Sequence, residues 1–120
     1  MMSDGLSRAI KIVRELHRLQ PSMTLTCALT LLIAARYEGC TIGFLLRQTG
    51  ATKSSLSRYV QELSEVRGFG VGKDGRAAPI LGHGLLLTRS RPENRTEKEV
   101  FLTMRGRELV AVIEEIMRQP

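Results

Sequence analysis

Apolar residues recur every three or four positions near both ends of the 120-residue chain, which is the spacing of an amphipathic helix. The pattern predicts a first helix within residues 1–21, ended by Pro21, and a last helix over residues 104–120. Their apolar stripes are Leu6, Ile10, Val13 and Leu16 in the first and Leu109, Val112, Ile113 and Ile116 in the last. A chain of this length cannot easily cover two such broad faces within one subunit, so the end helices are candidates for a dimer contact.

Residues 24–66 predict a helical core that contains a helix-turn-helix. Residues 24–39 are apolar on most sides, as expected of a central helix, and Gly39 is a natural closing residue. Two shorter helices follow, with Thr41 and Thr52 as their capping residues and Gly50 in the tight turn between them.

The second of these short helices has one apolar and one polar face. Its apolar stripe, which belongs in the core, is Leu56, Tyr59, Val60 and Leu63. On the other face, small hydroxyls near the helix N-terminus let a phosphate approach the backbone amides, while Arg58 suits guanine and Gln61 suits adenine. The pattern therefore predicts a recognition helix for DNA, with binding residues Thr52, Lys53, Ser54, Ser57, Arg58 and Gln61.

Residues 85–103 predict a β-hairpin, or wing. Two β-prone runs, Leu85 to Arg89 and Glu99 to Thr103, flank a polar turn that begins at Pro92, so we expect a hairpin with a long tip. Cations that could reach DNA are spaced around it, although three glutamates partly cancel their charge. These cations are Arg89, Arg91, Arg95 and Lys98.

A glycine-rich stretch lies between the recognition helix and the wing. Residues 68–84 hold six of the eleven glycines, but they do not form a nucleotide-binding loop. Such a loop needs glycine where this chain has Arg67, and serine or threonine where it has Asp74. The flanking order, a helix before and a strand after, is also the reverse of the required one.

We interpret residues 67–84 as an insertion. The sequence Lys73-Asp74-Gly75 suits a turn, which could close a small extra hairpin, and Lys73 and Arg76 are candidates for contacts with the DNA backbone.

Charge favours a polyanionic partner, because the chain carries a formal net charge of +6 and has a pI near 10. No targeting signal or long apolar span is present, so a cytoplasmic location without membrane contact is expected. His17 and His83 stand alone and no metal-ligand spacing occurs, so we expect neither an enzyme nor a bound metal or cofactor.

The segments TGATKSSLSRYVQELSE and GLLLTRSRPENRTEKEVFLTMRGREL resemble the MarR-type winged-helix transcription regulators, and the likeness extends from about residue 24 to the end. Leu102, Thr103 and Gly106 match the family's wing-to-helix segment. The wing tip departs from it, with Asn94 in place of aspartate and Thr96 in place of arginine. Arg95 then becomes the best candidate for insertion into the minor groove.

The resemblance implies a mainly α fold with a β-hairpin wing, that is, one winged helix-turn-helix domain over residues 1–120. It also implies a homodimer built by the first and last helices, which binds double-stranded DNA and represses transcription. Family members often respond to a phenolic ligand or to cysteine oxidation; no effector of this chain can be named from its residues. Cys27 fits a buried core position and Cys40 a helix junction, and neither has a neighbouring cation that would activate it.

An alternative from another class stays open. Winged helices also act as adaptors that bind other proteins, for example a phage or plasmid protein that binds a host factor. The glutamates of the wing and its altered tip favour this alternative.

Overall fold

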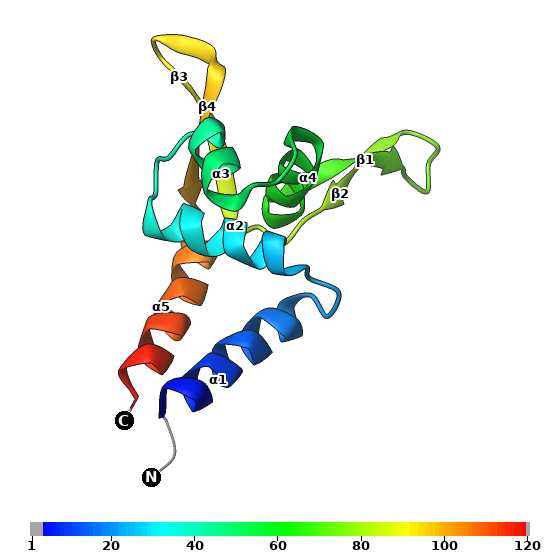
Figure 1. The fold of residues 1–120 in the computed structure, drawn as a ribbon. Coiled ribbons are helices and arrows are strands. Elements are labelled where there is room, and N and C mark those ends of the chain that lie inside the picture. Colours follow the sequence, from blue (N-terminus) through cyan, green and yellow to red (C-terminus); the bar gives the residue numbers. More distant parts are fainter. Residues whose placement is uncertain (1–3, 120) are drawn as a thin grey trace.

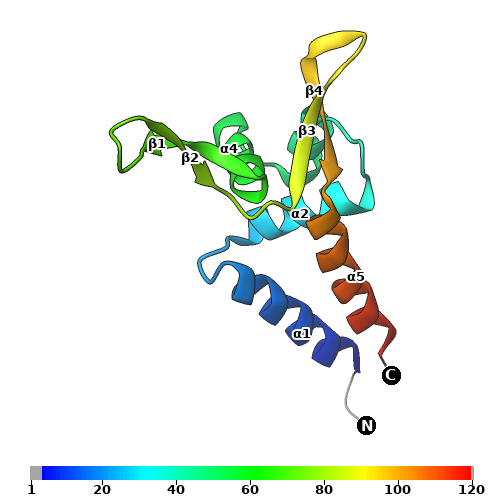
Figure 2. The same cartoon turned by 180° about the vertical axis from the view of Figure 1, so that it is seen from behind.

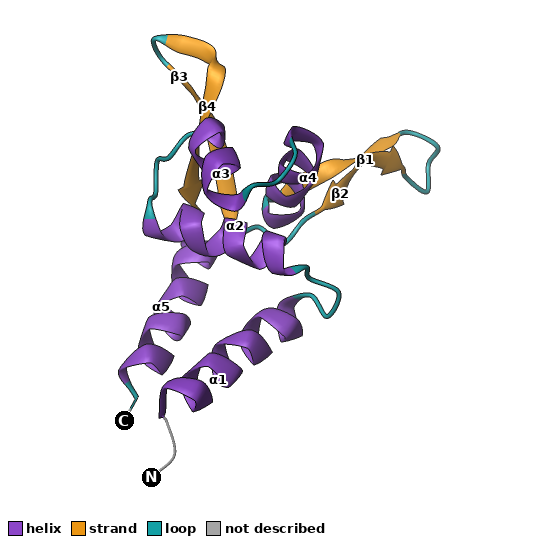
Figure 3. Ribbon diagram, viewed as in Figure 1, coloured by secondary structure: helices purple, strands orange, loops and turns teal. Residues whose placement is uncertain are grey.

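Five helices and two separate two-stranded sheets make up the part of the chain that the structure describes (Figures 1 and 3). The computed structural model describes residues 4–119, without the side chains of residues 4, 66–68 and 95. The helices are α1 (Asp4–Leu19), α2 (Leu25–Arg36), α3 (Ile42–Thr49), α4 (Lys53–Leu63) and α5 (Met104–Arg118). The strands are β1 (Val66–Val71), β2 (Ala77–Leu81), β3 (Leu86–Arg91) and β4 (Asn94–Leu102).

Helix α2 lies at the centre and separates two ends of the molecule. On one side it packs against α3, α4 and β4; on the other, α1 and α5 run toward the two termini (Figures 1 and 2). The core contains residues from α1 to α4, the β3–β4 hairpin and the segment before it. Its fully buried apolar side chains are Cys27, Leu31, Ala34, Leu45, Leu56, Leu63, Leu85, Leu86 and Val100.

Threonine caps start four of the helices. The hydroxyl oxygens of Thr24, Thr41, Thr52 and Thr103 each accept a hydrogen bond from the backbone N–H three residues later. Such a cap contributes about 1 kcal/mol of stability. The predicted caps Thr41 and Thr52 are confirmed, and so is the turn at Gly50, which has φ +70°.

The end of α2 differs from the sequence prediction. The helix ends at Arg36, with Tyr37 as its C-cap, rather than running to Gly39. Gly39 has φ +90°, and its N–H donates to the carbonyl of Val100 at 2.7 Å, so it joins the wing strand β4 instead.

The wing is formed by β3 and β4, and its predicted long tip is wrong. Arg91 pairs directly with Asn94, so only Pro92 and Glu93 form the turn. The segment from Asn94 to Lys98, expected as loop, is strand because its backbone pairs with Ser90 and Arg91 of β3 across an irregularity after Ser90.

The insertion folds as a second hairpin, β1–β2, closed by the turn at residues 73–75. The N–H of Gly72 donates to the carbonyl of Arg76 at 2.7 Å, and Gly75 has φ +79°, a conformation that glycine adopts without strain. The suggested extra hairpin is therefore confirmed. It projects from α4 on the side away from the wing (Figures 1 and 2).

The base of this second hairpin is joined to the end of α4. Four consecutive N–H groups, those of residues 82–85, donate to the carbonyls of Glu65, Glu62, Ser64 and Leu63 at 2.7–3.0 Å. A Cβ on Gly82 would lie 2.1 Å from the carbonyl oxygen of Ser64, so only glycine fits there. The same holds for Gly106, where a Cβ would lie 2.2 Å from the carbonyl oxygen of Leu85.

Candidate nucleic-acid interface

Helix α4 presents its polar face to solvent. Leu56, Val60 and Leu63 are buried, while Tyr59, expected in the apolar stripe, is only half-buried. The residues predicted to contact DNA all lie exposed along the opposite face: Lys53, Ser54, Ser57, Arg58 and Gln61. The amphipathic pattern therefore corresponds to a real division between core and surface.

Thr52 has a local role at the start of α4. Its hydroxyl oxygen accepts from the N–H of Ser55 at 3.1 Å and lies 3.3 Å from the hydroxyl of Ser54. Thr52 therefore orients the first turn of the helix and its neighbouring hydroxyl.

The exposed face of α4 is bordered by hollows on both sides. On the wing side, Ser57 and Gln61 line a cavity of about 250 Å³ together with Thr88 and Lys98 of the wing. On the other side, Arg58 and Gln61 line a cavity of about 230 Å³ with Ile80 of the second hairpin. The guanidinium of Arg58 also lies 5.5 Å from the centre of the Tyr59 ring. Ser57, Gln61 and Lys98 thus line one hollow, and Gln61 also borders the other hollow with Arg58.

Arg91 of the wing is held by three carboxylates. Its guanidinium nitrogens lie 3.2 Å from Glu93, 3.2 Å from Glu97 and 3.5 Å from Glu99. The hydrogen bond to Glu97 and the negative charges around it raise the pKa of Arg91 above its ordinary value. The positive charge of Arg91, which was expected to contact DNA, is therefore already surrounded by negative charge. The predicted long loop did not place these glutamates beside Arg91, because it lacked the strand pairing that brings them there.

The other wing cations have different environments. The guanidinium carbon of Arg89 lies 5.0 Å from the centre of the Phe101 ring, a cation–π arrangement that fixes the side chain along the strand. Lys98 is exposed on the neighbouring strand. The side chain of Arg95, the candidate for the minor groove, lies outside the described residues.

At the wing tip, Asn94 and Thr96, which stand where the resemblance predicts an Asp–Arg pair, make a local contact with each other. The side-chain oxygen Oδ1 of Asn94 accepts from the backbone N–H of Thr96 at 3.1 Å and from its hydroxyl at 2.7 Å. The contact between Asn94 and Thr96, at the start of β4, is therefore a neutral hydrogen bond.

Lys73 and Arg76 lie at the tip of the second hairpin, and both are exposed. The turn between them is held by the carboxylate of Asp74, which accepts from the backbone N–H of Arg76 at 3.0 Å. The structure therefore places these two candidate backbone contacts away from the wing, on the far side of α4 (Figure 1).

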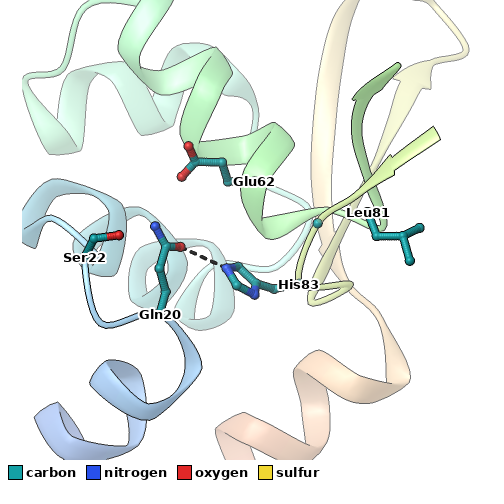
Figure 4. Close-up of a pocket in the computed structure, with 6 residues that line it drawn as sticks. Gln20, Ser22, Glu62, Leu81 and His83 are labelled. Carbon is teal, nitrogen blue, oxygen red and sulfur yellow. Dashed lines mark hydrogen bonds between the residues drawn. The ribbon is translucent and has the colours of Figure 1, made fainter. Parts of the chain in front are cut away.

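A polar pocket at the base of the second hairpin was not anticipated from the sequence. Gln20, Ser22, Glu62 and His83 line a volume of about 280 Å³, and Nε2 of His83 lies 2.9 Å from Oε1 of Gln20 (Figure 4). This hydrogen bond joins the end of α1 to the segment that follows β2. The two residues are 63 positions apart, so no local sequence pattern predicts it.

Burial makes the thiols of both cysteines less acidic. Burial raises the pKa of the Cys27 thiol from 9.0 to about 11, with a smaller contribution from the charge of Glu62. Burial also raises the pKa of Cys40. Among the described residues, no group of three or more histidine, cysteine or acidic side chains could hold a metal ion. In the same part of the chain, no helix is long and apolar enough to cross a membrane.

The arrangement of α3, α4 and the β3–β4 wing defines a winged helix-turn-helix domain. More particularly, the fold is that of the MarR-type regulators, as three solved structures indicate. The crystal structure of MarR matches 95% of this chain and 69% of its own, with a TM-score of 0.60 and 22% identity.

Two further structures give the same result. An uncharacterized SlyA-like transcription regulator from Listeria monocytogenes matches 91% of this chain and 59% of its own, with a TM-score of 0.56 and 15% identity. RV1404 from Mycobacterium tuberculosis matches 94% and 68%, with a TM-score of 0.59 and 20% identity. No protein-family model and no curated protein sequence matches the chain. At these identities the likeness is one of fold.

Proposed function

We propose that this chain is a sequence-specific DNA-binding regulator of transcription, which acts as a homodimeric repressor in the cytoplasm by occupying its promoter. The observation that carries the proposal is the exposed polar face of α4, presented by a helix-turn-helix and bordered by a wing. The SlyA-like transcription regulator among the similar structures supports it.

In this proposal, α4 enters the major groove with its N-terminal half. Lys53, Ser54 and Ser57 contact phosphates near the positive end of the helix dipole. Arg58 and Gln61, one turn further along, reach base edges, where arginine pairs with guanine and glutamine with adenine.

The two hairpins contact the DNA backbone on either side of α4. From the wing, Arg89, Arg95 and Lys98 supply positive charge, and Arg91 contributes less because three glutamates surround it. From the second hairpin, Lys73 and Arg76 contact phosphates. These contacts strengthen binding to every sequence and make it sensitive to salt.

Apolar surface that the single chain leaves uncovered supports the proposed dimer. Side chains on three helices are exposed although they are large and hydrophobic: Leu6, Ile10, Val13, Leu25, Leu29, Leu32, Val112 and Met117. A second copy that covers this surface would present two recognition helices to half-sites roughly 34–36 Å apart.

Selection of bound duplexes from a random pool, followed by gel-shift titration at two salt concentrations, tests the proposal. We expect an inverted-repeat site, a dimer on that site and much weaker, strongly salt-dependent binding to random duplex. Absence of salt-sensitive DNA binding at micromolar protein refutes the regulator proposal.

The ion pairs of Arg91 favour a second candidate, a protein-binding adaptor. A wing whose central cation already has three carboxylate partners supplies less attraction for phosphates. If the chain binds no duplex in the titration, and if an affinity column bearing it retains a defined protein only when the wing is intact, the adaptor replaces the regulator.

A further inference from the structure

One face of the second hairpin is apolar and exposed. The register places Phe69 opposite Pro79 and Val71 opposite Ala77, so these four side chains share a face, and Leu81 follows two residues after Pro79 on the same strand. Phe69 is 72% exposed, Val71 82% and Leu81 72%. We call these five residues the hairpin face.

Such a face needs a partner, because an isolated two-stranded hairpin is at best marginally stable in water. Here the hairpin is held at its base by the hydrogen bonds between residues 82–85 and the end of α4. The strands beyond that base leave Phe69 and Val71 largely in solvent. Apolar patches of this kind on soluble proteins typically mark interaction sites.

The hairpin face continues toward a helix that already has uncovered apolar surface. Leu81 points away from Gln20 and His83 (Figure 4) and lines a cavity of about 400 Å³ with Met104, the first residue of α5. Met104 is itself 79% exposed, so exposed apolar surface continues from the hairpin face onto the first turn of α5. The hairpin face is therefore adjacent to the start of α5, one of the helices assigned above to the dimer.

The area of the hairpin face and the charge of the hairpin tip indicate how a partner covers this face. A stable interface buries roughly 800 Å² per partner, more than five side chains supply, so the hairpin face adds to a larger contact. The face carries no charge, whereas the hairpin tip has a net positive charge from Lys73 and Arg76 with Asp74 between them. Two copies packed antiparallel keep the tips apart, and a parallel arrangement would bring two net positive tips together.

We propose that the hairpin face packs against the same face of a second copy of this chain, as an additional part of the subunit contact. The proposal rests on the homodimer of the proposed function. The hairpin projects from α4 on the side away from the wing (Figure 2). In the proposed dimer, the two hairpins therefore lie between the recognition helices, and the two wings lie at the outer ends of the bound DNA.

Cysteine cross-linking tests this contact. In a background with Cys27→Ala and Cys40→Ser, Phe69→Cys is placed at the middle of the hairpin face, and Ala78→Cys, on the opposite face of the same hairpin, serves as the matched control. On mild oxidation of the dimer we expect Phe69→Cys to form a disulfide between two copies, at least ten times faster than Ala78→Cys does.

A second variant keeps the proposal testable if a cysteine disturbs the fold. The combined change Phe69→Thr, Val71→Thr and Leu81→Thr retains strand-forming residues and removes most of the apolar area. We expect its dimer dissociation constant, measured by sedimentation, to rise tenfold or more, with an unchanged circular dichroism spectrum. If the circular dichroism spectrum of this variant changes, the cross-linking result alone decides whether the hairpin contact exists.

Four outcomes are distinguishable, because DNA binding is measured on the same samples. A wild-type dimer in which Phe69→Cys cross-links no faster than the control overturns the hairpin contact and leaves the regulator standing. Rapid maleimide labelling of Phe69→Cys in the dimer shows a face open to a different protein and also overturns it. A monomeric wild-type chain overturns both the hairpin contact and the homodimer, whereas loss of DNA binding alone refutes only the regulator.

Discussion

A methyl group on Gly82 would lie 2.1 Å from the carbonyl oxygen of Ser64, nearer than any real contact. The close approach lets the chain leaving β2 run alongside the end of α4 and donate its N–H groups to that helix end. The segment that follows β2 and the end of the recognition helix are therefore one connected unit.

Gly82→Ala should reduce the free energy of unfolding by about 3 kcal/mol, because the two backbones must separate. Urea unfolding measures the loss. Gly75→Ala is the matched control: a Cβ there meets nothing within 4 Å, and only its φ of +79° carries a cost of roughly 1–2 kcal/mol. Equal losses in the two variants would show that the contact with Ser64 is unimportant.

Arg58→Ala should weaken binding to the selected site about 10- to 100-fold and binding to random duplex much less, since a base contact carries roughly 1–3 kcal/mol of discrimination. Gel-shift titration of both duplexes measures the two effects. Arg14→Ala, on the exposed side of α1, controls for the loss of one positive charge. Equal weakening on both duplexes would exclude base reading by Arg58.

Arg91→Ala should weaken binding to all duplexes similarly, because its loss leaves Glu93, Glu97 and Glu99 without their cation. Glu97→Gln should have the opposite effect and strengthen binding to random duplex, since it removes a negative charge beside Arg91. Titrations at low salt give the largest signal. If both variants bind like wild type, the wing does not approach phosphates.

Replacing Lys73 and Arg76 together with alanine should lower the slope of log affinity against log salt concentration by up to about 2, since each phosphate contact contributes roughly 0.9. The measurement is a series of titrations at increasing salt on the selected site. An unchanged slope would mean that the hairpin tip stays away from the DNA.

The stability of the chain should fall as pH rises from about 9 to about 11, through the titration of Cys27. The folded state holds the thiol neutral, so its contribution is fully present below the unfolded pKa of 9.0 and disappears as pH passes the folded pKa of about 11. Urea unfolding at stepped pH checks this. Cys27→Ala should be less stable at neutral pH but should lose less stability over that range, and a parallel loss in both proteins would contradict the assignment.

The structural features that the sequence predicts correctly are those that depend on residues close together in the chain. The threonine caps of α3 and α4, the turn at Gly50 and the apolar stripe of α4 are confirmed because helix spacing and capping are local properties. The match at Gly106 also acquires a physical reason, its close approach to the carbonyl of Leu85.

What the sequence could not predict depends on contacts between distant segments. Helix α2 ends before Gly39, whose N–H donates a hydrogen bond to the carbonyl of Val100, sixty-one positions away along the chain. The wing tip is short because strand pairing continues to Arg91 and Asn94, and this pairing brings the glutamates of β4 around Arg91. The contact between His83 and Gln20 is of the same kind.

The junction at the base of the second hairpin has a consequence for how the chain can change. The N–H of Gly82 lies 3.0 Å from the carbonyl oxygen of Glu65, so the segment between them leaves and re-enters the domain at one point. Residues 66–81 therefore form a replaceable module, which can be lengthened, exchanged or removed at that junction while the helix-turn-helix and the wing keep their mutual positions.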